Sequence, residues 1–161
     1  MISGESTGEL LSGAQMNLQQ MLERDEGRKH EAYPDPLTKG DPFTIGIGHC
    51  GPEVHPGLVW DDNMIDDAFQ LDIAAATQDC MDHFDPWFSA LNDPRQAVLV
   101  AMRFQMGIAR LLGFARTLQA VKEGRYKDAA DGMQASVWAR QTPLRALRMS
   151  EQMSTGEWVL T

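Results

Sequence analysis

Two carboxylates and a hydroxyl lie close together in the chain, at Glu26, Asp35 and Thr44. Such side chains can perform acid–base chemistry when their environments differ, because one carboxyl then holds a proton while the other stays ionised. The common alternative is that acidic residues of this kind are simply solvated at the surface. The elements around these residues therefore decide how they are interpreted.

Glu26 is predicted to lie in the last turn of an amphipathic helix. Leu18, Met21 and Leu22 have helical spacing, and Glu26 continues their stripe toward the buried face. Gly27 follows at once and is a typical helix terminator, so Glu26 lies beside the partly negative end of the helix. Both conditions disfavour the ionised form, which suits a general acid at neutral pH. Asp35 lies beside a polar turn and is expected to stay ionised.

Two short strands are predicted after this helix. Residues 31–35 indicate an edge strand, since Pro34 lacks the donor that a central strand needs. A turn over residues 36–42 leads to a second strand over residues 43–49, which alternates between two faces. One face of that strand carries almost no side-chain bulk: Thr44, Gly46 and Gly48. A bare strand face often marks the close approach of a ligand, so Gly46 is a candidate substrate contact.

A long helix is predicted over residues 63–82, with Asp61 or Asp62 as its N-cap. A helix of this length extends about 30 Å and can join two lobes. Two neighbouring stripes run along it. The first is apolar, with Met64, Ala68, Leu71 and Ala75, and the second has Ile65, Phe69 and Asp72. Asp72 therefore lies on a packed face, where an acid needs a partner.

The remaining chain is predicted to be a helical bundle. Asp93 and Pro94 provide an N-cap and a first-turn proline for an apolar helix that ends near Gly107. Its core positions are Val98, Leu99, Met102 and Met106. Thr142 and Pro143 repeat the cap-and-proline signal for the last substantial helix. Further short helices lie between these two.

The charge is unevenly distributed. Residues 61–93 carry nine acidic and no basic side chains, whereas residues 94–161 carry ten basic and five acidic ones. A basic C-terminal lobe suits an anionic polymer such as bacterial cell wall, although solubility alone is an equal explanation. Neither a strong basic stripe nor a nucleic-acid-binding motif is present, so no nucleic-acid partner is expected.

The cysteines and histidines are scattered, without the spacing of metal ligands. We expect no metal or other cofactor, and free thiols at Cys50 and Cys80. The chain contains neither a membrane span nor the features of a signal peptide, so we expect it to accumulate in the cytoplasm of the cell that makes it.

The order of these motifs resembles the phage-type lysozymes, the endolysin family of the T-even phages. The resemblance covers roughly residues 18–160. It rests on Glu-Gly at 26–27, Tyr-x-Asp at 33–35 and Thr-Ile-Gly-Ile-Gly-His at 44–49, continues in Phe-Gln-Met-Gly at 104–107, Trp138 and Gln-Thr-Pro at 141–143, and ends in Arg145, Thr155-Gly156 and Trp158.

The resemblance implies a lysozyme-like α+β fold that is predominantly α. A small N-terminal lobe with a short antiparallel sheet would be joined by a long helix to a larger helical lobe. We expect a flexible extension over residues 1–14 and one catalytic domain over residues 15–161. Within this domain, residues 15–60 would form the active-site helix and sheet lobe, residues 61–82 the connecting helix, and residues 83–161 the helical lobe.

The resemblance also implies roles for the candidate residues. Glu26 would be the acid, Asp35 the partner that aids the attacking water, and Thr44 the third member. Gln105 would lie in the substrate cleft, and Arg145 would pair with Glu26. His49 and Asp72 would form a structural pair. The chain departs from the family pattern in its acidic segment, in a shortened sheet lobe, and in Ala101 where relatives often carry Asn.

The function expected from these observations is hydrolysis of the β-1,4 bond between N-acetylmuramic acid and N-acetylglucosamine in peptidoglycan, with inversion, for lysis of the host cell. A monomer released to the wall by a holin-type protein is expected. One alternative is a wall-binding or virion structural module that kept the fold without efficient catalysis. Another is a lytic effector delivered against rival bacteria.

Overall fold

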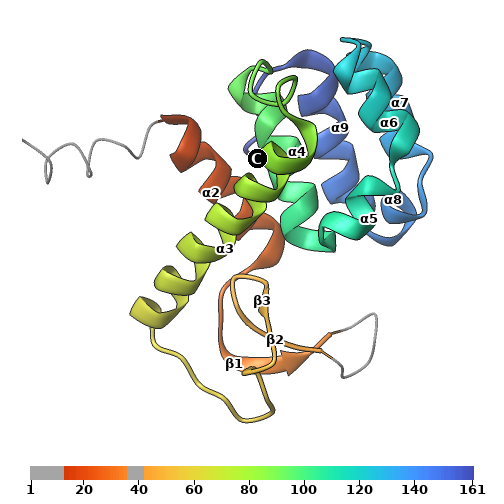
Figure 1. The fold of residues 1–161 in the computed structure, drawn as a ribbon. Coiled ribbons are helices and arrows are strands. Elements are labelled where there is room, and N and C mark those ends of the chain that lie inside the picture. Colours follow the sequence, from red (N-terminus) through yellow and green to blue (C-terminus); the bar gives the residue numbers. More distant parts are fainter. Residues whose placement is uncertain (1–12, 36–41) are drawn as a thin grey trace, which may run out of the picture.

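The computed structural model describes residues 13–35 and 42–161. A small sheet lies at one end of the long helix α3 (Asp62–Phe84), and the shorter helices gather at the other end (Figure 1). The predicted α+β fold, predominantly helical, is therefore confirmed. Most of the predicted N-terminal extension lies outside the described residues.

Helix α2 (Gly13–Glu26) positions the candidate acid as predicted. Its buried residues are Leu18, Met21 and Leu22. Gly27 ends the helix in a left-handed conformation with φ of 73°, which glycine adopts without steric cost. Glu26 is thus the last residue of the helix, at the point where the chain leaves for the sheet.

The sheet contains three antiparallel strands in the order β1 (Lys29–Pro34), β2 (Phe43–Gly46) and β3 (His49–Cys50). The edge position predicted for the first strand is confirmed. Thr44 in the central strand pairs with Tyr33 on one side and Cys50 on the other. Most of the turn predicted over residues 36–42 lies outside the described residues.

The single strand predicted over residues 43–49 is wrong, because the chain reverses at Ile47 and Gly48 and returns as β3. Gly46 and Gly48 have φ of 68° and 69°, in the left-handed region that favours glycine. The two glycines therefore form a tight hairpin rather than one bare face of a continuous strand.

Helix α3 begins at the predicted cap, since the side chain of Asp61 accepts a hydrogen bond from the Met64 amide. The predicted apolar stripe is wrong in part, because Met64 and Leu71 are 51% and 72% exposed. The buried side is the neighbouring stripe predicted with Ile65, Phe69 and Asp72. Asp72 is half-buried, and the fully buried residues continue along the helix: Ile65, Phe69, Ile73, Ala76, Cys80 and Phe84.

Six helices complete the described chain: α4 (Asp93–Met106), α5 (Ile108–Leu112), α6 (Ala115–Lys122), α7 (Tyr126–Gln134), α8 (Val137–Gln141) and α9 (Pro143–Thr155). The N-cap of α4 is Asn92 rather than the predicted Asp93, and its side chain accepts from the Arg95 amide. Thr142 does precede α9, but its hydroxyl donates to the Trp138 carbonyl instead of capping the helix.

One apolar core runs through both lobes, from Leu22 of α2 to Met153 of α9. The predicted core positions of α4 are all buried. A polar residue lies within this core: Gln152 is fully buried, donates to the Pro94 carbonyl and accepts from the Val159 amide. Gln152 also donates to the sulfur of Met21 in α2, so this helix is fixed to the helical lobe although it leads into the sheet. Across the two described ranges, no helix is both long and apolar enough to cross a membrane.

Candidate active site

The carboxylate of Glu26 lies between the end of α2 and the start of α9. Arg145 Nη1 is 2.9 Å from Glu26 Oε1, and the two side chains are only 14% and 15% exposed. Arg145 Nη2 also donates to the Asp25 carbonyl at 2.6 Å. The predicted pairing of Arg145 with Glu26 is therefore present, and a second bond to the backbone fixes the guanidinium.

The hairpin between β2 and β3 approaches Glu26 from the sheet side. A Cβ atom placed on Gly48 would lie 2.6 Å from Glu26 Oε2, closer than real Cβ contacts allow. Glycine is therefore required at position 48 for a second reason besides its left-handed φ, since any side chain there would displace the carboxylate. This contact brings the sheet against the candidate acid.

Asp35 follows strand β1, and Thr44 is half-buried in β2. Burial raises the pKa of Tyr33, and the negative charges of Glu26 and then Asp35 raise it further. Burial also raises the pKa of Cys50, with Asp72, Asp35 and Glu26 adding to the effect. The charges of Glu26 and Asp35 thus both raise the pKa of Tyr33 and of Cys50.

These two side chains flank Thr44 in the sheet, because Tyr33 and Cys50 are its partners in the strand pairing. The structure therefore brings Glu26, Asp35 and Thr44 into one neighbourhood. One carboxylate comes from the end of a helix, and the other two members come from the sheet.

His49 forms the predicted pair with Asp72, with 2.7 Å between Nδ1 and Oδ2. The Nε2 atom is also 2.7 Å from Oε2 of Glu53, a partner that was not predicted. The hydrogen bond to Asp72 is the largest cause of a raised pKa of His49, which reaches about 9 although burial opposes it. We call His49, Asp72 and Glu53 the histidine cluster. It fixes β3 to the middle of α3.

Gln105 and Gly46 are placed differently from the trio. Gln105 Oε1 accepts a hydrogen bond from the Trp138 indole at 2.8 Å, and Trp138 is buried. Gly46 is buried, and its open side faces Trp60 and Ile65 at 3.4–3.5 Å. Gly46 therefore contacts the small-lobe core, and the structure does not bring it to the catalytic neighbourhood.

A small cavity of about 190 Å³ opens beside the candidate acid, between the hairpin and helices α3 and α4. Its lining includes the same Gly48 that contacts Glu26, together with Cys50, Asp72, Ala75, Arg103 and Phe104. Arg103 is held by an ion pair with Asp79, with 2.6 Å between Nε and Oδ2. Polar and aromatic groups beside a carboxylate suit a sugar ring.

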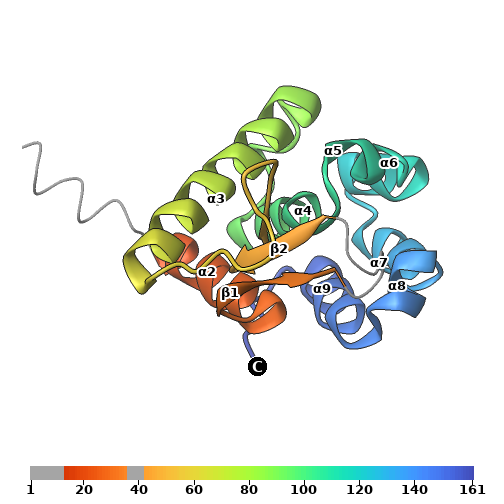
Figure 2. The same ribbon diagram turned by 90° about the horizontal axis from the view of Figure 1, so that it is seen from below.

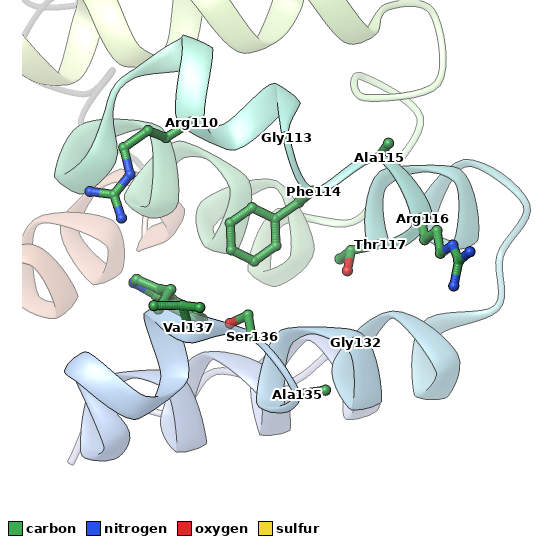
Figure 3. Close-up of a pocket in the computed structure, with 11 residues that line it drawn as sticks. Arg110, Gly113, Phe114, Ala115, Arg116, Thr117, Gly132, Ala135, Ser136 and Val137 are labelled. Carbon is green, nitrogen blue, oxygen red and sulfur yellow. The ribbon is translucent and has the colours of Figure 1, made fainter.

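A larger hollow of about 720 Å³ lies in the helical lobe, between the α5–α6 segment and the α7–α8 segment. Phe114 and Val137 lie on its opposite walls, and Arg110 and Arg116 flank it (Figure 3). Its lining contains no member of the candidate trio. The lining of the smaller cavity contains no trio member either, but it includes Gly48, which lies against Glu26, and Cys50, which pairs with Thr44.

Sequence reasoning assigned no role to Asp25, Tyr33, Cys50 or Glu53. The signal for Glu53 was available, since it lies four residues after His49. Asp25 had no such signal, because its partners Arg145 and Arg148 come from a helix far along the chain. No group of three or more His, Cys, Asp and Glu residues that could hold a metal occurs among the described residues.

A fold with a small sheet, a connecting helix and a helical lobe, with an arginine-bound glutamate between them, defines a lysozyme-like protein. The model of the phage lysozyme family matches residues 23–151, so the chain belongs to this family.

Individual relatives agree with this membership. Probable T4-type lysozyme 1 of Dictyostelium discoideum is 28% identical over 87% of this chain and 95% of its own length. The pre-baseplate central spike protein Gp5 of Enterobacteria phage T4 is 32% identical over 88% of this chain, but this is 28% of its own length. Peptidoglycan hydrolase gp36 of Pseudomonas phage phiKMV is 29% identical over 96% of this chain and 17% of its own length. The chain thus spans nearly all of one relative and a minor part of two others.

Proposed function

We propose that this chain is a muramidase, which hydrolyses the β-1,4 bond between N-acetylmuramic acid and N-acetylglucosamine in bacterial peptidoglycan. Glu26 protonates the glycosidic oxygen. Asp35 aids the attacking water, and Thr44 holds that water or a sugar substituent. Family membership supports a lysozyme-type glycoside hydrolase, and similarity to the peptidoglycan hydrolase of phage phiKMV supports peptidoglycan as substrate.

The observation that carries this proposal is the placement of Glu26. Its carboxylate contacts the guanidinium of Arg145 from one lobe and the backbone of Gly48 from the other. A carboxyl in this position faces the boundary between the lobes, next to a cavity lined by polar and aromatic side chains. A sugar chain bound there would lie between Glu26 and the sheet that carries Asp35 and Thr44.

A turbidity assay on purified peptidoglycan tests the proposal. The wild-type protein should clear the suspension, whereas Glu26→Gln should lose at least a hundredfold in rate, because the amide cannot donate the proton. Asp35→Asn should also be impaired. Glu151→Gln, an exposed acid on α9, is the matched control and should clear normally. Equal clearing by wild type and Glu26→Gln would refute the assignment of the acid.

We further propose that the reaction inverts the anomeric carbon, as expected for carboxyls separated by roughly 6.5–9.5 Å with a water between them. Proton NMR of the newly released reducing end distinguishes the two outcomes. The first-formed anomer should be α, and a β product would show retention.

We also propose a role in lysis of the host cell, with accumulation in the host cytoplasm and release by a holin-type protein. Expression of the chain alone should leave the cells intact, and co-expression with a membrane-permeabilising protein should lyse them. Lysis by the chain alone would contradict this proposal.

The spike protein among the relatives favours a second candidate, a lysozyme-like module with a structural role in a virion. Such a module would bind peptidoglycan without clearing it. Sedimentation with insoluble peptidoglycan, measured beside the clearing rate, separates the two candidates. Binding without any clearing by the wild-type protein would favour the structural module.

A further inference from the structure

Asp25, the residue before the candidate acid, is nearly completely buried, with its side chain 2% exposed. Three arginines surround its carboxylate. Arg24 donates to both oxygens at 2.8 and 3.1 Å. Arg148 Nη1 lies 3.7 Å from Oδ1, and Arg145 Nε lies 3.9 Å from Oδ2. A buried carboxylate with three cations around it has more positive partners than one ion pair needs.

Arg145 connects this group to the candidate acid, because the same guanidinium bonds to the Asp25 carbonyl and to Glu26 Oε1. We call Arg24, Arg145, Arg148, Asp25 and Glu26 the arginine cluster. Its guanidinium groups stay charged at any working pH. Three positive charges therefore face two carboxylates, so the cluster has a net charge of +1 when Glu26 is ionised and +2 when Glu26 carries a proton.

This balance matters for a general acid. An acid must hold a proton before it can donate it, and neighbouring positive charge favours the ionised form. Without the carboxylate of Asp25, a protonated Glu26 would lie in a cluster with a net charge of +3. Asp25 therefore reduces the electrostatic cost of protonating Glu26, while Arg145 still orients the carboxyl.

We propose that Asp25 is a positioning residue for the reaction: its buried carboxylate neutralises the arginines around Arg145, so that Arg145 can hold Glu26 in place without keeping it ionised. The proposal rests on the proposed function, in which Glu26 donates a proton. It goes beyond that function by assigning a second carboxylate that acts through Arg145.

The sheet elements packed near Glu26 bring both neutral and charged groups. Tyr33 from β1 and Cys50 from β3 are neutral at neutral pH, since the pKa of each is raised. Asp35 is the further carboxylate acting on these two groups. The charged groups on this side of Glu26 are thus Asp35 and, across Cys50, Asp72 and Glu53 of the histidine cluster; the three cations of the arginine cluster lie on the side of α9 and α2.

Charge-changing variants of the cluster test the proposal through the pH dependence of kcat/KM. Asp25→Asn should move the upper limb of the profile to lower pH by about one unit, with roughly a tenfold loss at pH 7 that is recovered at lower pH. Arg148→Gln, which touches Asp25 rather than Glu26, should move the limb to higher pH. The double variant should return the limb toward the wild-type position, because its net charge is that of the wild type.

A purely structural role gives a different result. Both single variants would then lower thermal stability, the double variant would lower it further, and the limb would stay in place. An unmoved limb in Arg148→Gln overturns the proposal even if Asp25→Asn does not fold.

A ¹³C NMR titration of the Glu26 carboxyl, assigned with Glu26→Gln, reports the same shifts without any activity. This measurement separates failure of the proposed function from failure of the role of Asp25. Midpoints that do not move in opposite directions in the two single variants would overturn the role of Asp25, whether or not the wild-type protein clears peptidoglycan.

Discussion

Two ionic clusters meet the β2–β3 hairpin at neighbouring residues, Gly48 and His49, and they are built with opposite charge ratios. The arginine cluster has three cations and two carboxylates, whereas the histidine cluster has one cation between two carboxylates. The first joins α2 to α9, and the second joins β3 to α3. Each cluster fixes one side of the candidate site to a helix.

The clusters differ most in how their cations respond to pH. Arginine stays charged throughout, so the arginine cluster applies a constant field to Glu26. Histidine loses its charge within the accessible range, so the histidine cluster contributes stability that depends on pH. The comparison indicates that one side of the site serves the chemistry of a carboxyl and the other serves the attachment of the sheet.

Removing the central arginine should have the largest effect. Arg145→Met leaves Asp25 and Glu26 with less cationic partner charge in a buried position, which should cost about 3 kcal/mol of unfolding free energy and most of the clearing activity. Urea denaturation and the turbidity assay measure the two losses. Arg125→Met is the matched control, since Arg125 forms exposed ion pairs and its loss should leave both measurements unchanged. Equal behaviour of the two variants would contradict the importance of the arginine cluster.

A change in the hairpin between the clusters should have the next largest effect. Gly48→Ala places a methyl group against Glu26 and requires alanine to adopt a φ of 69°, which costs about 1–2 kcal/mol from the backbone alone. Gly57→Ala is the matched control, because its φ is 87° but a Cβ there meets no atom within 4 Å. Both variants should lose stability in denaturation, and only Gly48→Ala should lose clearing rate, by roughly tenfold. Equal clearing rates would show that the contact with Glu26 is unimportant.

Replacing His49 in the histidine cluster should lower the free energy of unfolding by an amount that depends on pH. The folded-state pKa of His49 is about 9, above the value of 6.5 for a free side chain, so its stabilisation is fully present below pH 6.5 and is lost as pH rises through 9. His49→Asn should therefore cost about 2 kcal/mol at pH 6, allowing for solvent screening near the exposed Glu53, and much less at pH 9.5.

Unfolding free energies across this pH range check the expectation. A loss for His49→Asn that does not change with pH would contradict it. His30→Asn serves as the control, since His30 pairs with Asp62 at an exposed position, where loss of the pair should cost little stability.

The smallest effect should come from Glu53, the partner of His49 that was not predicted. Glu53→Gln removes an exposed carboxylate, 57% exposed, while Asp72 stays bonded to His49. The expected loss is about 0.3 kcal/mol below pH 6.5. A loss as large as that of Asp72→Asn in parallel denaturation curves would show that the two carboxylates share the stabilisation of His49 equally.

Local patterns were enough to predict the elements that carry the trio. The stripe that ends at Glu26 and the cap at Asp61 are interactions within one helix, so periodicity and residue type determine them. The hairpin at Gly48 was missed because a period of two was continued through glycines that turn the chain. On α3 two neighbouring stripes were predicted, and tertiary packing buried the one with Ile65 and Phe69.

The charge balance around the acid could not be predicted from sequence alone. Asp25 and Glu26 are neighbours in the chain, and helical spacing turned only Glu26 toward the stripe. The role proposed for Asp25 depends on arginines at positions 145 and 148, which approach it only after α9 packs against α2. The buried Gln152 is a similar case, because its partners at Pro94 and Val159 come from other parts of the chain.

The attachment of helix α2 to the helical lobe has a consequence for how the sheet and this lobe can move relative to each other. Its apolar side belongs to the common core, and Arg24 donates to the Val159 carbonyl at 2.8 Å, so Glu26 is anchored to the helical lobe. Asp35 and Thr44 are carried by the sheet. A rotation of the sheet relative to the helical lobe would separate Glu26 from Asp35 and Thr44, and its reversal would reunite them. Opening to admit a polymer and assembling the reactive groups would then be one movement.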